Sequence, residues 1–224
     1  MGNTTEELRL FEMLFRGGWV MWPLVAFSLA SVAIIIERIF WGPRKERVIP
    51  ASLQRDVLES ASRGRAEEII GLCRSDNSPL ARMVLVIAKN IEKPRMLIVE
   101  ATQRAGRKEI VRMQRFLPTL GTIAAAAPLL GLLGTVSGMI TTFQTLNVQG
   151  LGNASGLSGG IAEALITTAT GLGIAIPSLI FHRAYMARIR EYVVELESIS
   201  SEVLDELLDF NAEDEQTTSS VRLV

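Results

Sequence analysis

Charged side chains are absent from two long stretches of the sequence. No Asp, Glu, Lys or Arg occurs in residues 17–36, and none occurs in residues 116–162. A helix in a soluble domain normally turns one face to water, so it has no reason to avoid charge over such lengths. An ionisable side chain near the centre of a bilayer costs about 2.5–3.5 kcal/mol. The two stretches therefore indicate segments that lie in a membrane.

Cysteine and histidine each occur once, as Cys73 and His182. A single cysteine excludes an intrachain disulfide and a metal site with several thiolates, and we expect neither a metal nor a cofactor. Cys73 fits a small buried hydrophobic residue. His182 stands beside Arg183 at the end of an apolar segment, which is more typical of a membrane boundary than of a ligand. The net charge of −1 gives no indication of nucleic-acid binding.

Three apolar segments are long enough to cross a bilayer as helices, because the hydrocarbon layer needs about 20 residues. They lie at residues 19–36, 117–143 and 161–182. Acidic residues outnumber basic ones before the first segment, so it is interpreted as a retained anchor and not as a signal peptide. The expected fold is all-α, an integral membrane protein with three transmembrane helices and long cytoplasmic helical extensions.

The distribution of basic residues predicts the orientation of the chain. Residues 44–115 hold 16 Lys and Arg against 9 Asp and Glu, whereas residues 144–160 hold neither. Because basic residues stay on the cytoplasmic side, we expect the amino terminus outside and the carboxyl terminus inside. The expected divisions are an outer amphipathic segment at 1–18, transmembrane helices at 19–41, 116–143 and 161–182, a cytoplasmic helical region at 42–115, a short outer loop at 144–160, a cytoplasmic helix at 183–210 and a disordered tail at 211–224.

Long helices are expected to join the membrane spans to the cytoplasmic part. From Pro94 to Phe143 the only internal breakers are Pro118 and Pro128, which lipid-embedded helices tolerate as kinks. The second span is therefore predicted to continue a helix that starts at Pro94. An apolar stripe likewise carries the third span on to about Phe210.

Small residues gather on one face of the second span. Projected at about 100° per residue, Gly131, Thr135, Gly138 and Thr142 fall within about 80° of Pro128. Such a face suits either a pore lining or close helix packing, and packing is an equal interpretation for Gly131, Gly134 and Gly138. The two threonines could also bond to carbonyls of their own helix.

The third span has a polar arc that contains one carboxylate. Measured from Glu163, the arc of about 160° includes Thr167, Thr168 and Thr170, and Pro177 follows inside the same span. A carboxylate on the hydroxyl face of a span is a functional candidate. The alternative is a glutamate at a helix start, where it would favour the positive end of the dipole. Because Glu163 is the only carboxylate in the spans, a proton path would need several copies of the chain and a second protein.

The motifs of the second and third spans resemble those of the ExbB and TolQ proteins, which are relatives of the flagellar MotA stator. They are Gly131-Leu132-Leu133-Gly134-Thr135-Val136-Ser137-Gly138 in the second span, and Gly160-Ile161-Ala162-Glu163-Ala164-Leu165 with Thr168, Gly171-Leu172 and Ala175-Ile176-Pro177 in the third. The resemblance is specific over residues 116–185 and consistent in topology over the rest. Three spans are closer to ExbB or TolQ than to MotA, which has four.

The resemblance implies a non-enzymatic, proton-driven motor subunit in the bacterial inner membrane, surrounded by lipid and not bound to nucleic acid. It implies a homopentamer whose pore, lined by spans two and three, holds the single helices of two ExbD- or TolR-like subunits. In the family a partner aspartate carries the proton, residues matching Thr135 and Thr168 face it, and Glu163 matches the pore glutamate. The work is implied to act on a TonB- or TolA-like envelope protein.

Two other function classes fit a three-span protein. A secondary transporter normally contains internal repeats and broken helices around its substrate, and this sequence has no repeat symmetry. A passive membrane scaffold would have no use for Glu163 on a hydroxyl face. The presence of a neighbouring gene for a single-span protein with an aspartate in its span would separate the motor from the scaffold.

Overall fold

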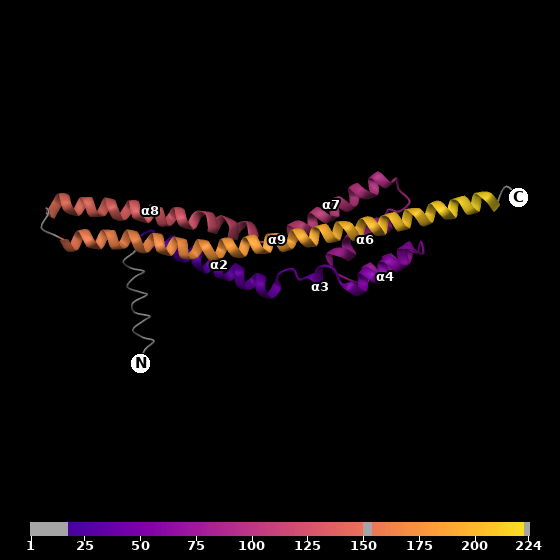
Figure 1. Ribbon diagram of the computed structural model, residues 1–224, viewed down its shortest axis with the longest axis horizontal. Coiled ribbons are helices and arrows are strands. Elements are labelled where there is room, and N and C mark those ends of the chain that lie inside the picture. Colours follow the sequence, from indigo (N-terminus) through magenta and orange to yellow (C-terminus); the bar gives the residue numbers. More distant parts are fainter. Residues whose placement is uncertain (1–17, 150–153, 222–224) are drawn as a thin grey trace, which may run out of the picture. The chain divides into compact units, whose positions relative to one another are not determined.

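The computed structural model describes residues 18–149 and 154–221, and in these ranges every regular element is an α-helix (Figure 1). The chain forms two compact units, one of residues 18–41 and 116–185, the other of residues 42–115 and 186–221. The all-α prediction is confirmed. The predicted amphipathic segment at residues 1–18 lies outside the described residues, apart from Gly18.

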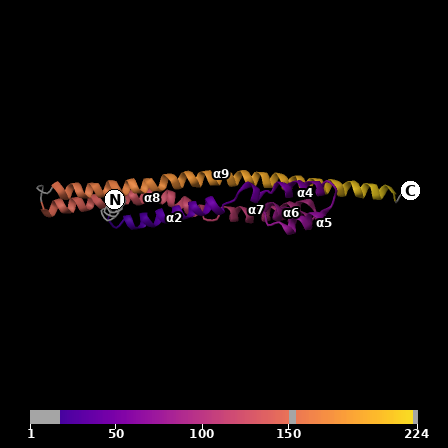
Figure 2. The same cartoon turned by 90° about the horizontal axis from the view of Figure 1, so that it is seen from below.

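The first unit contains three helices that are long and apolar enough to cross a membrane. They are α2 (Met21–Trp41), α8 (Leu117–Gln149) and the first part of α9 (Ala154–Val221). Figures 1 and 2 both show α8 running alongside the first part of α9. The prediction of three transmembrane helices is therefore confirmed.

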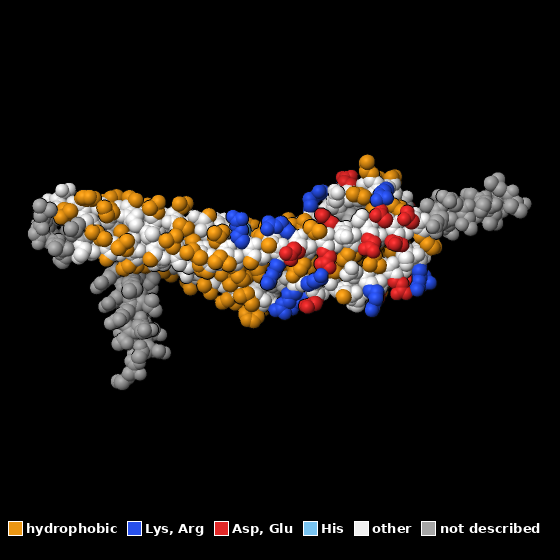
Figure 3. Space-filling model, in the orientation of Figure 1, with side chains coloured by type: hydrophobic (Ala, Val, Ile, Leu, Met, Phe, Trp, Pro, Cys, Tyr) orange, Lys and Arg blue, Asp and Glu red, His pale blue; other side chains and the backbone are white. Residues whose placement is uncertain are grey.

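A small apolar core joins the three helices of this unit. Val20, in the turn before α2, and Leu24 of α2 are fully buried. They form one cluster with Ala127 of α8 and Ile174 of α9. Many large apolar side chains of the same helices point outward instead (Figure 3). Examples are Trp22, Leu29, Leu129, Val136, Leu165 and Ile180, each at least half exposed. Because a water-soluble surface seldom carries so much apolar area, this surface suits contact with lipid.

The second unit is built from short helices packed with the later part of α9. They are α3 (Lys45–Val48), α4 (Ala51–Ala61), α5 (Ala66–Ser75), α6 (Pro79–Lys89) and α7 (Arg95–Met113). Prolines mark three of the helix starts: Pro50 and Pro94 precede α4 and α7, and Pro79 is the first residue of α6. The Ser78 hydroxyl accepts a hydrogen bond from the N–H of Ala81, which caps α6.

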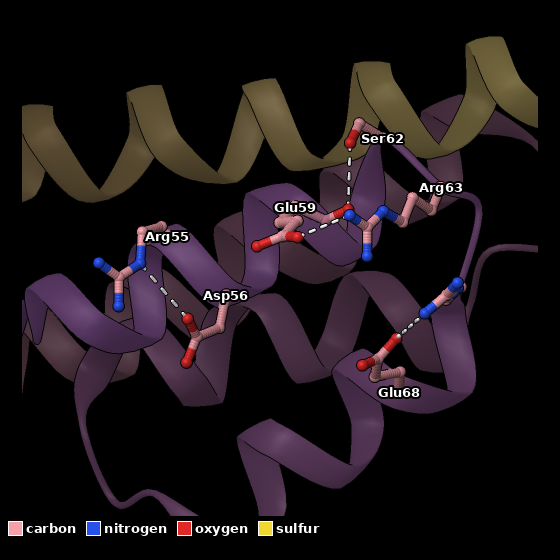
Figure 4. A network of polar contacts seen from close by, with 7 residues as sticks. Arg55, Asp56, Glu59, Ser62, Arg63 and Glu68 are labelled. Atoms are coloured by element: carbon pink, nitrogen blue, oxygen red, sulfur yellow. Dashed lines mark hydrogen bonds and ion pairs between the residues drawn. The ribbon is translucent and has the colours of Figure 1, made fainter.

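The apolar stripe of α9 forms part of the core of the second unit. Ile189, Leu196, Ile199, Val203 and Leu207 are all buried, which agrees with the predicted continuation of the third span to about Phe210. On the face seen in Figure 3, Lys, Arg, Asp and Glu side chains are spread over this unit. Figure 4 shows surface pairs on α4 and α5, such as Arg63 with Glu59, whose nearest atoms are 2.7 Å apart.

The prediction of one continuous helix from Pro94 through the second span is wrong. α7 ends at Met113, and Phe116 adopts a φ of 63° before α8 begins at Leu117. Pro118 explains the break, because inside a helix its ring would clash with the carbonyl of Gln114 four residues back. In the first turn of α8 the same proline is tolerated, since its missing N–H would have no partner there.

The predicted outer loop at residues 144–160 is too long, because α8 extends to Gln149 and α9 begins at Ala154. A glycine in this stretch serves packing within a helix and does not form a turn. A Cβ atom at Gly160 would lie 3.0 Å from the carbonyl oxygen of Gly138.

At its other end α9 continues to Val221, where a disordered tail was predicted from residue 211. The tail contains no glycine or proline that would end a helix.

Candidate functional site

The site begins with a close contact between α8 and α9, made by glycines of the second span. A Cβ atom at Gly131 would lie 3.0 Å from the Cα atom of Thr168, and one at Gly138 would lie 3.1 Å from the Cβ of Ala164. A Cβ at Gly134 would overlap the Thr167 side chain. Only glycine allows the two backbones to approach this closely. Gly131, Gly134 and Gly138 therefore serve helix packing, one of the two interpretations that the sequence allowed.

Glycines of α9 complete the contact from the other side. A Cβ atom at Gly171 would lie 2.6 Å from the carbonyl oxygen of Ala127 and 3.2 Å from the Cα of Gly131. A Cβ at Gly160 would overlap the hydroxyl of Thr142. The contact is thus made by backbone and small side chains.

Four of the five candidate threonines donate their hydroxyl hydrogens within their own helices, namely Thr135, Thr142, Thr167 and Thr170. Thr142 bonds to the carbonyl of Gly138 at 2.8 Å, and Thr167 bonds to that of Ala164 at 2.9 Å. Thr170 bonds to the carbonyl of its own helix one turn back, also at 2.8 Å. Thr142 and Thr167 are buried between α8 and α9, whereas Thr170 is half-buried. The hydroxyls of Thr142 and Thr167 are therefore satisfied inside the single chain.

Thr135 and Thr168 lie together on one edge of the α8–α9 pair. The Thr168 hydroxyl donates across to the carbonyl oxygen of Gly131, 3.0 Å away. In an α-helix the same carbonyl accepts from the N–H of Thr135, one turn further along α8. The Thr135 hydroxyl donates to the carbonyl of Leu132 at 2.7 Å, and both threonines remain partly exposed. This edge carries hydroxyls that another molecule can still reach.

Glu163 lies well inside α9 and not at its start. The helix begins at Ala154, more than two turns earlier, so the helix-start interpretation of this carboxylate loses its basis. The side chain is half-buried, and its carboxylate lies against Gly18 in the turn that precedes α2. Thr168 is about 140° away around α9. The structure therefore brings Thr135 and Thr168 together and places Glu163 on the side of α9 that faces the start of α2.

The two candidate prolines stand inside continuous helices, Pro128 in α8 and Pro177 in α9. Each lacks the N–H that would bond to a carbonyl one turn back. Pro128 is half-buried and Pro177 is exposed. His182 packs on α8, where a Cβ atom at Gly121 would lie 3.0 Å from its Nε2 atom. Among the described residues no three His, Cys, Asp or Glu side chains lie close enough to hold a metal ion.

A cluster at the opposite end of the first unit was not predicted from the sequence. Arg38 of α2 is buried, with its Nε 3.2 Å from a carboxylate oxygen of Glu37 and its Cζ 5.9 Å from the centre of the Phe116 ring. The Tyr185 hydroxyl donates a hydrogen bond to the backbone carbonyl of Arg38. Arg38 of α2, Phe116 directly before α8 and Tyr185 of α9 therefore meet here. An arginine directly after an apolar span was the available signal, but it suggested only a boundary residue.

Comparison with known proteins matches the chain to one family of membrane proteins. The model of the MotA/TolQ/ExbB proton channel family matches residues 75–198, which include the α8–α9 pair and Glu163. A protein from Synechocystis sp. described as an ExbB-like biopolymer transport protein is 35% identical over 208 residues, which are 89% of this chain and 79% of that protein.

Two further relatives extend the similarity across different organisms. A biopolymer transport protein ExbB homologue from Methanothermobacter thermautotrophicus is 30% identical over 190 residues, or 85% of this chain and 67% of the relative. The Tol-Pal system protein TolQ from Haemophilus influenzae is 27% identical over 209 residues, or 83% of this chain and 87% of the relative. Each alignment covers most of both chains.

Proposed function

The chain belongs to the MotA/TolQ/ExbB proton channel family, and from this premise we propose that it forms the pore of a proton-driven motor complex. Membership supports a role in energy transduction for this multi-pass membrane protein. The finer proposal is that proton flow through the pore drives mechanical work on an envelope-spanning protein of the TonB or TolA kind, without enzymatic chemistry.

The observation that carries the proposal is the composition of the membrane unit. In its apolar stretches at residues 19–36, 117–143 and 161–182 the one carboxylate is Glu163, which lies well inside α9 and away from the helix start. A lone ionisable group in a span is costly and is retained where it serves an ion path. Thr135 and Thr168 supply partly exposed hydroxyls on one edge of the helix pair. These three residues are proposed to contribute to the proton path.

A pore requires more than one copy of the chain. The backbones of α8 and α9 approach closely at Gly131 and Gly171, and we propose that protons pass between copies and not through one. We therefore propose a homo-oligomer, with five copies by resemblance to the family. Two ExbD- or TolR-like helices, each with an aspartate, are proposed to stand in its centre. Thr142, Thr167 and the glycines would hold α8 and α9 together in the wall of the pore. The half-buried Thr170 would lie at the edge of this wall.

The proposed setting is a bacterial inner membrane. The basic residues of 44–115 and the uncharged stretch at 144–160 support an amino terminus in the periplasm and a carboxyl terminus in the cytoplasm. In that orientation the second unit, with its charged surface, stands in the cytoplasm. Cysteine residues placed at 151 and 202, probed with a membrane-impermeant thiol reagent on intact cells, would test the two sides.

The test of function is Glu163→Gln, which keeps the shape of the side chain and removes its titration. The complex is purified with its single-span partner, reconstituted in liposomes and assayed for proton uptake with an internal pH dye. We expect uptake to fall at least about tenfold, with the oligomer intact by native mass spectrometry. Glu202→Gln, an exposed glutamate of the second unit, is the matched control and should retain uptake. Full uptake by an assembled Glu163→Gln complex would contradict the proposal.

A further inference from the structure

Gly18 occupies the turn that leads into α2, and the carboxylate of Glu163 lies directly against it. A Cβ atom at position 18 would overlap Oε1 of Glu163 and would lie 3.2 Å from its Cδ. The φ of Gly18 is 65°, in the left-handed region that favours glycine. Position 18 therefore requires glycine for two separate reasons, its backbone conformation and the carboxylate beside it.

The turn is held in a fixed place relative to α9. The Gly18 carbonyl accepts a hydrogen bond from the N–H of Met21 at 3.2 Å, which starts the first turn of α2. Val20 and Met21 are buried directly after it, in the core that also contains Ile174 of α9. Because Val20 and Met21 pack in a core with the helix that carries Glu163, the backbone of Gly18 borders the carboxylate.

From this contact we propose that Gly18 is a positioning residue for Glu163. The turn before α2 limits how far the carboxylate can swing around α9 and keeps it on the side opposite to the Thr168 edge. Nothing in the sequence pattern of the spans assigns a role to position 18, which lies outside the charge-free run of α8 and α9. The inference rests on the proposed function, because a fixed carboxylate matters only if Glu163 takes part in the proton path.

The variant that tests the contact is Gly18→Ala. The added methyl group competes with Oε1 for the same space, so the carboxylate has to leave its position. Proton uptake by the reconstituted complex should fall at least about tenfold with the oligomer intact. The carboxylate should also become easier to reach, so a hydrophobic carbodiimide should label Glu163 at least about fivefold faster, measured by mass spectrometry of the peptide.

Gly64→Ala provides a matched control for strain. Gly64 has a φ of 68°, and a Cβ atom there would overlap the ring of Phe210, but it lies in the second unit. The substitution therefore introduces the same backbone strain and a comparable overlap away from Glu163. It should lower stability and leave both uptake per assembled complex and the labelling rate of Glu163 unchanged.

Replacing Glu163 with the shorter aspartate distinguishes a positioning role of Gly18 from a general structural defect. In Glu163→Asp the carboxylate is drawn back by one methylene, which makes room for a methyl group at position 18. Adding Gly18→Ala to Glu163→Asp should therefore change the labelling rate of the aspartate less than about twofold. The same relief should appear in uptake, as a smaller loss from Gly18→Ala in the aspartate background.

The possible results separate the two levels of the proposal. If Glu163→Gln keeps full uptake, the proposed role of the carboxylate fails, whatever Gly18→Ala does. If Glu163→Gln abolishes uptake while Gly18→Ala leaves uptake and labelling unchanged, the pore role stands and the positioning role is overturned. Equal labelling changes in Gly18→Ala and Gly64→Ala, or an equal effect of Gly18→Ala in the glutamate and aspartate backgrounds, would also overturn it.

Discussion

The Thr168 hydroxyl donates a hydrogen bond to the carbonyl oxygen of Gly131, 3.0 Å away, and so ties α9 to α8 within the membrane unit. A carbonyl oxygen has two lone pairs, so it can accept this bond as well as the N–H of Thr135 in its own helix. The backbone near Thr135 and the side chain of Thr168 are thereby coupled. Both residues belong to the proposed proton path.

Thr168→Val should lower proton uptake and weaken the α8–α9 pair, because valine keeps the shape and removes the hydroxyl that bonds to the Gly131 carbonyl. The expected loss of stability is about 0.5–1.5 kcal/mol, measured by denaturant titration of the complex in detergent. Thr122→Val is the matched control. Its hydroxyl is exposed and bonds to the carbonyl of Pro118 in its own helix at 3.0 Å, so neither uptake nor stability should change appreciably.

Thr135→Val should behave differently from Thr168→Val. The Thr135 hydroxyl bonds only to Leu132 of its own helix, so its loss should alter stability by less than about 0.5 kcal/mol. If the hydroxyl serves the proton path, proton uptake should still fall although the stability is nearly unchanged. Full uptake by both valine variants would assign the hydroxyls to packing alone.

Gly134→Ala should destabilise the membrane unit, because its new Cβ would overlap the Thr167 side chain inside the α8–α9 contact. Overpacking of this kind costs about 1–3 kcal/mol. Gly173→Ala is the control within α9, since a Cβ there meets nothing within 4 Å and alanine is the better helix former. Thermal unfolding followed by circular dichroism should show a lower midpoint for Gly134→Ala and an equal or higher one for Gly173→Ala.

The membrane helices were predictable because the absence of charge is a strong signal that persists over many residues. The break before Phe116 was not, since Pro118 fits either a kink within a helix or the first turn of a new one. The choice between a kink and a new helix depends on how α8 is joined to α7. The sequence around Pro118 does not show this. The helix ends next to the loop at 144–160 were not predictable either, because spans of about 20 residues give the part within the bilayer and not how far each helix extends beyond it.

The candidate site was predicted as a set of residues but not as an arrangement. Helical projection placed Thr135, Thr142, Thr167 and Thr168 on small or polar faces, yet it could not separate the face that packs on α8 from the edge that stays open. The sequence also could not show that the carboxylate of Glu163 lies against Gly18. Gly18 lies 145 residues earlier in the numbering (163 − 18), and only the folded chain brings them together.

Cys73 should be almost inert toward maleimide in the folded protein. Burial, and to a lesser extent the charge of Asp76, raises the pKa of its thiol to about 11. The reactive thiolate should therefore remain scarce up to pH 9 and increase about tenfold per pH unit towards 11. Since the folded pKa exceeds the unfolded value, stability should also fall as the pH rises from about 9 to 11.

The control for Cys73 is an exposed thiol in the same unit. Val194 is 67% exposed, so Val194→Cys in a Cys73→Ala background should react readily at pH 7.5. Rapid labelling of wild-type Cys73 at the same pH, without denaturant, would mean that the thiol is accessible in solution. The measurement is the mass increase of the intact protein after a timed exposure.

Glu109 should contribute more to the second unit than any surface carboxylate, because it is buried and bonded to two arginines. Its side chain is 5% exposed, with Oε1 2.7 Å from Nη1 of Arg112 and 3.3 Å from Nε of Arg82. Arg82 belongs to α6 and the other two residues to α7, so the carboxylate joins neighbouring helices. Removing the charge leaves two guanidinium groups facing each other with a neutral amide between them. Glu109→Gln should therefore destabilise the protein by about 1.5–3 kcal/mol in denaturant titrations.

Glu59→Gln is the surface counterpart, and Figure 4 shows its pair with Arg63. The nearest atoms are again 2.7 Å apart, but the two side chains are 55% and 53% exposed, so water and salt weaken their attraction. Its loss should cost at most about 1 kcal/mol, and less in 1 M salt. The loss at Glu109 should depend less on salt, because its carboxylate is buried. Equal, salt-sensitive losses at both positions would show that burial adds nothing to the Glu109 pairs and that α6 and α7 are held together by their apolar side chains alone.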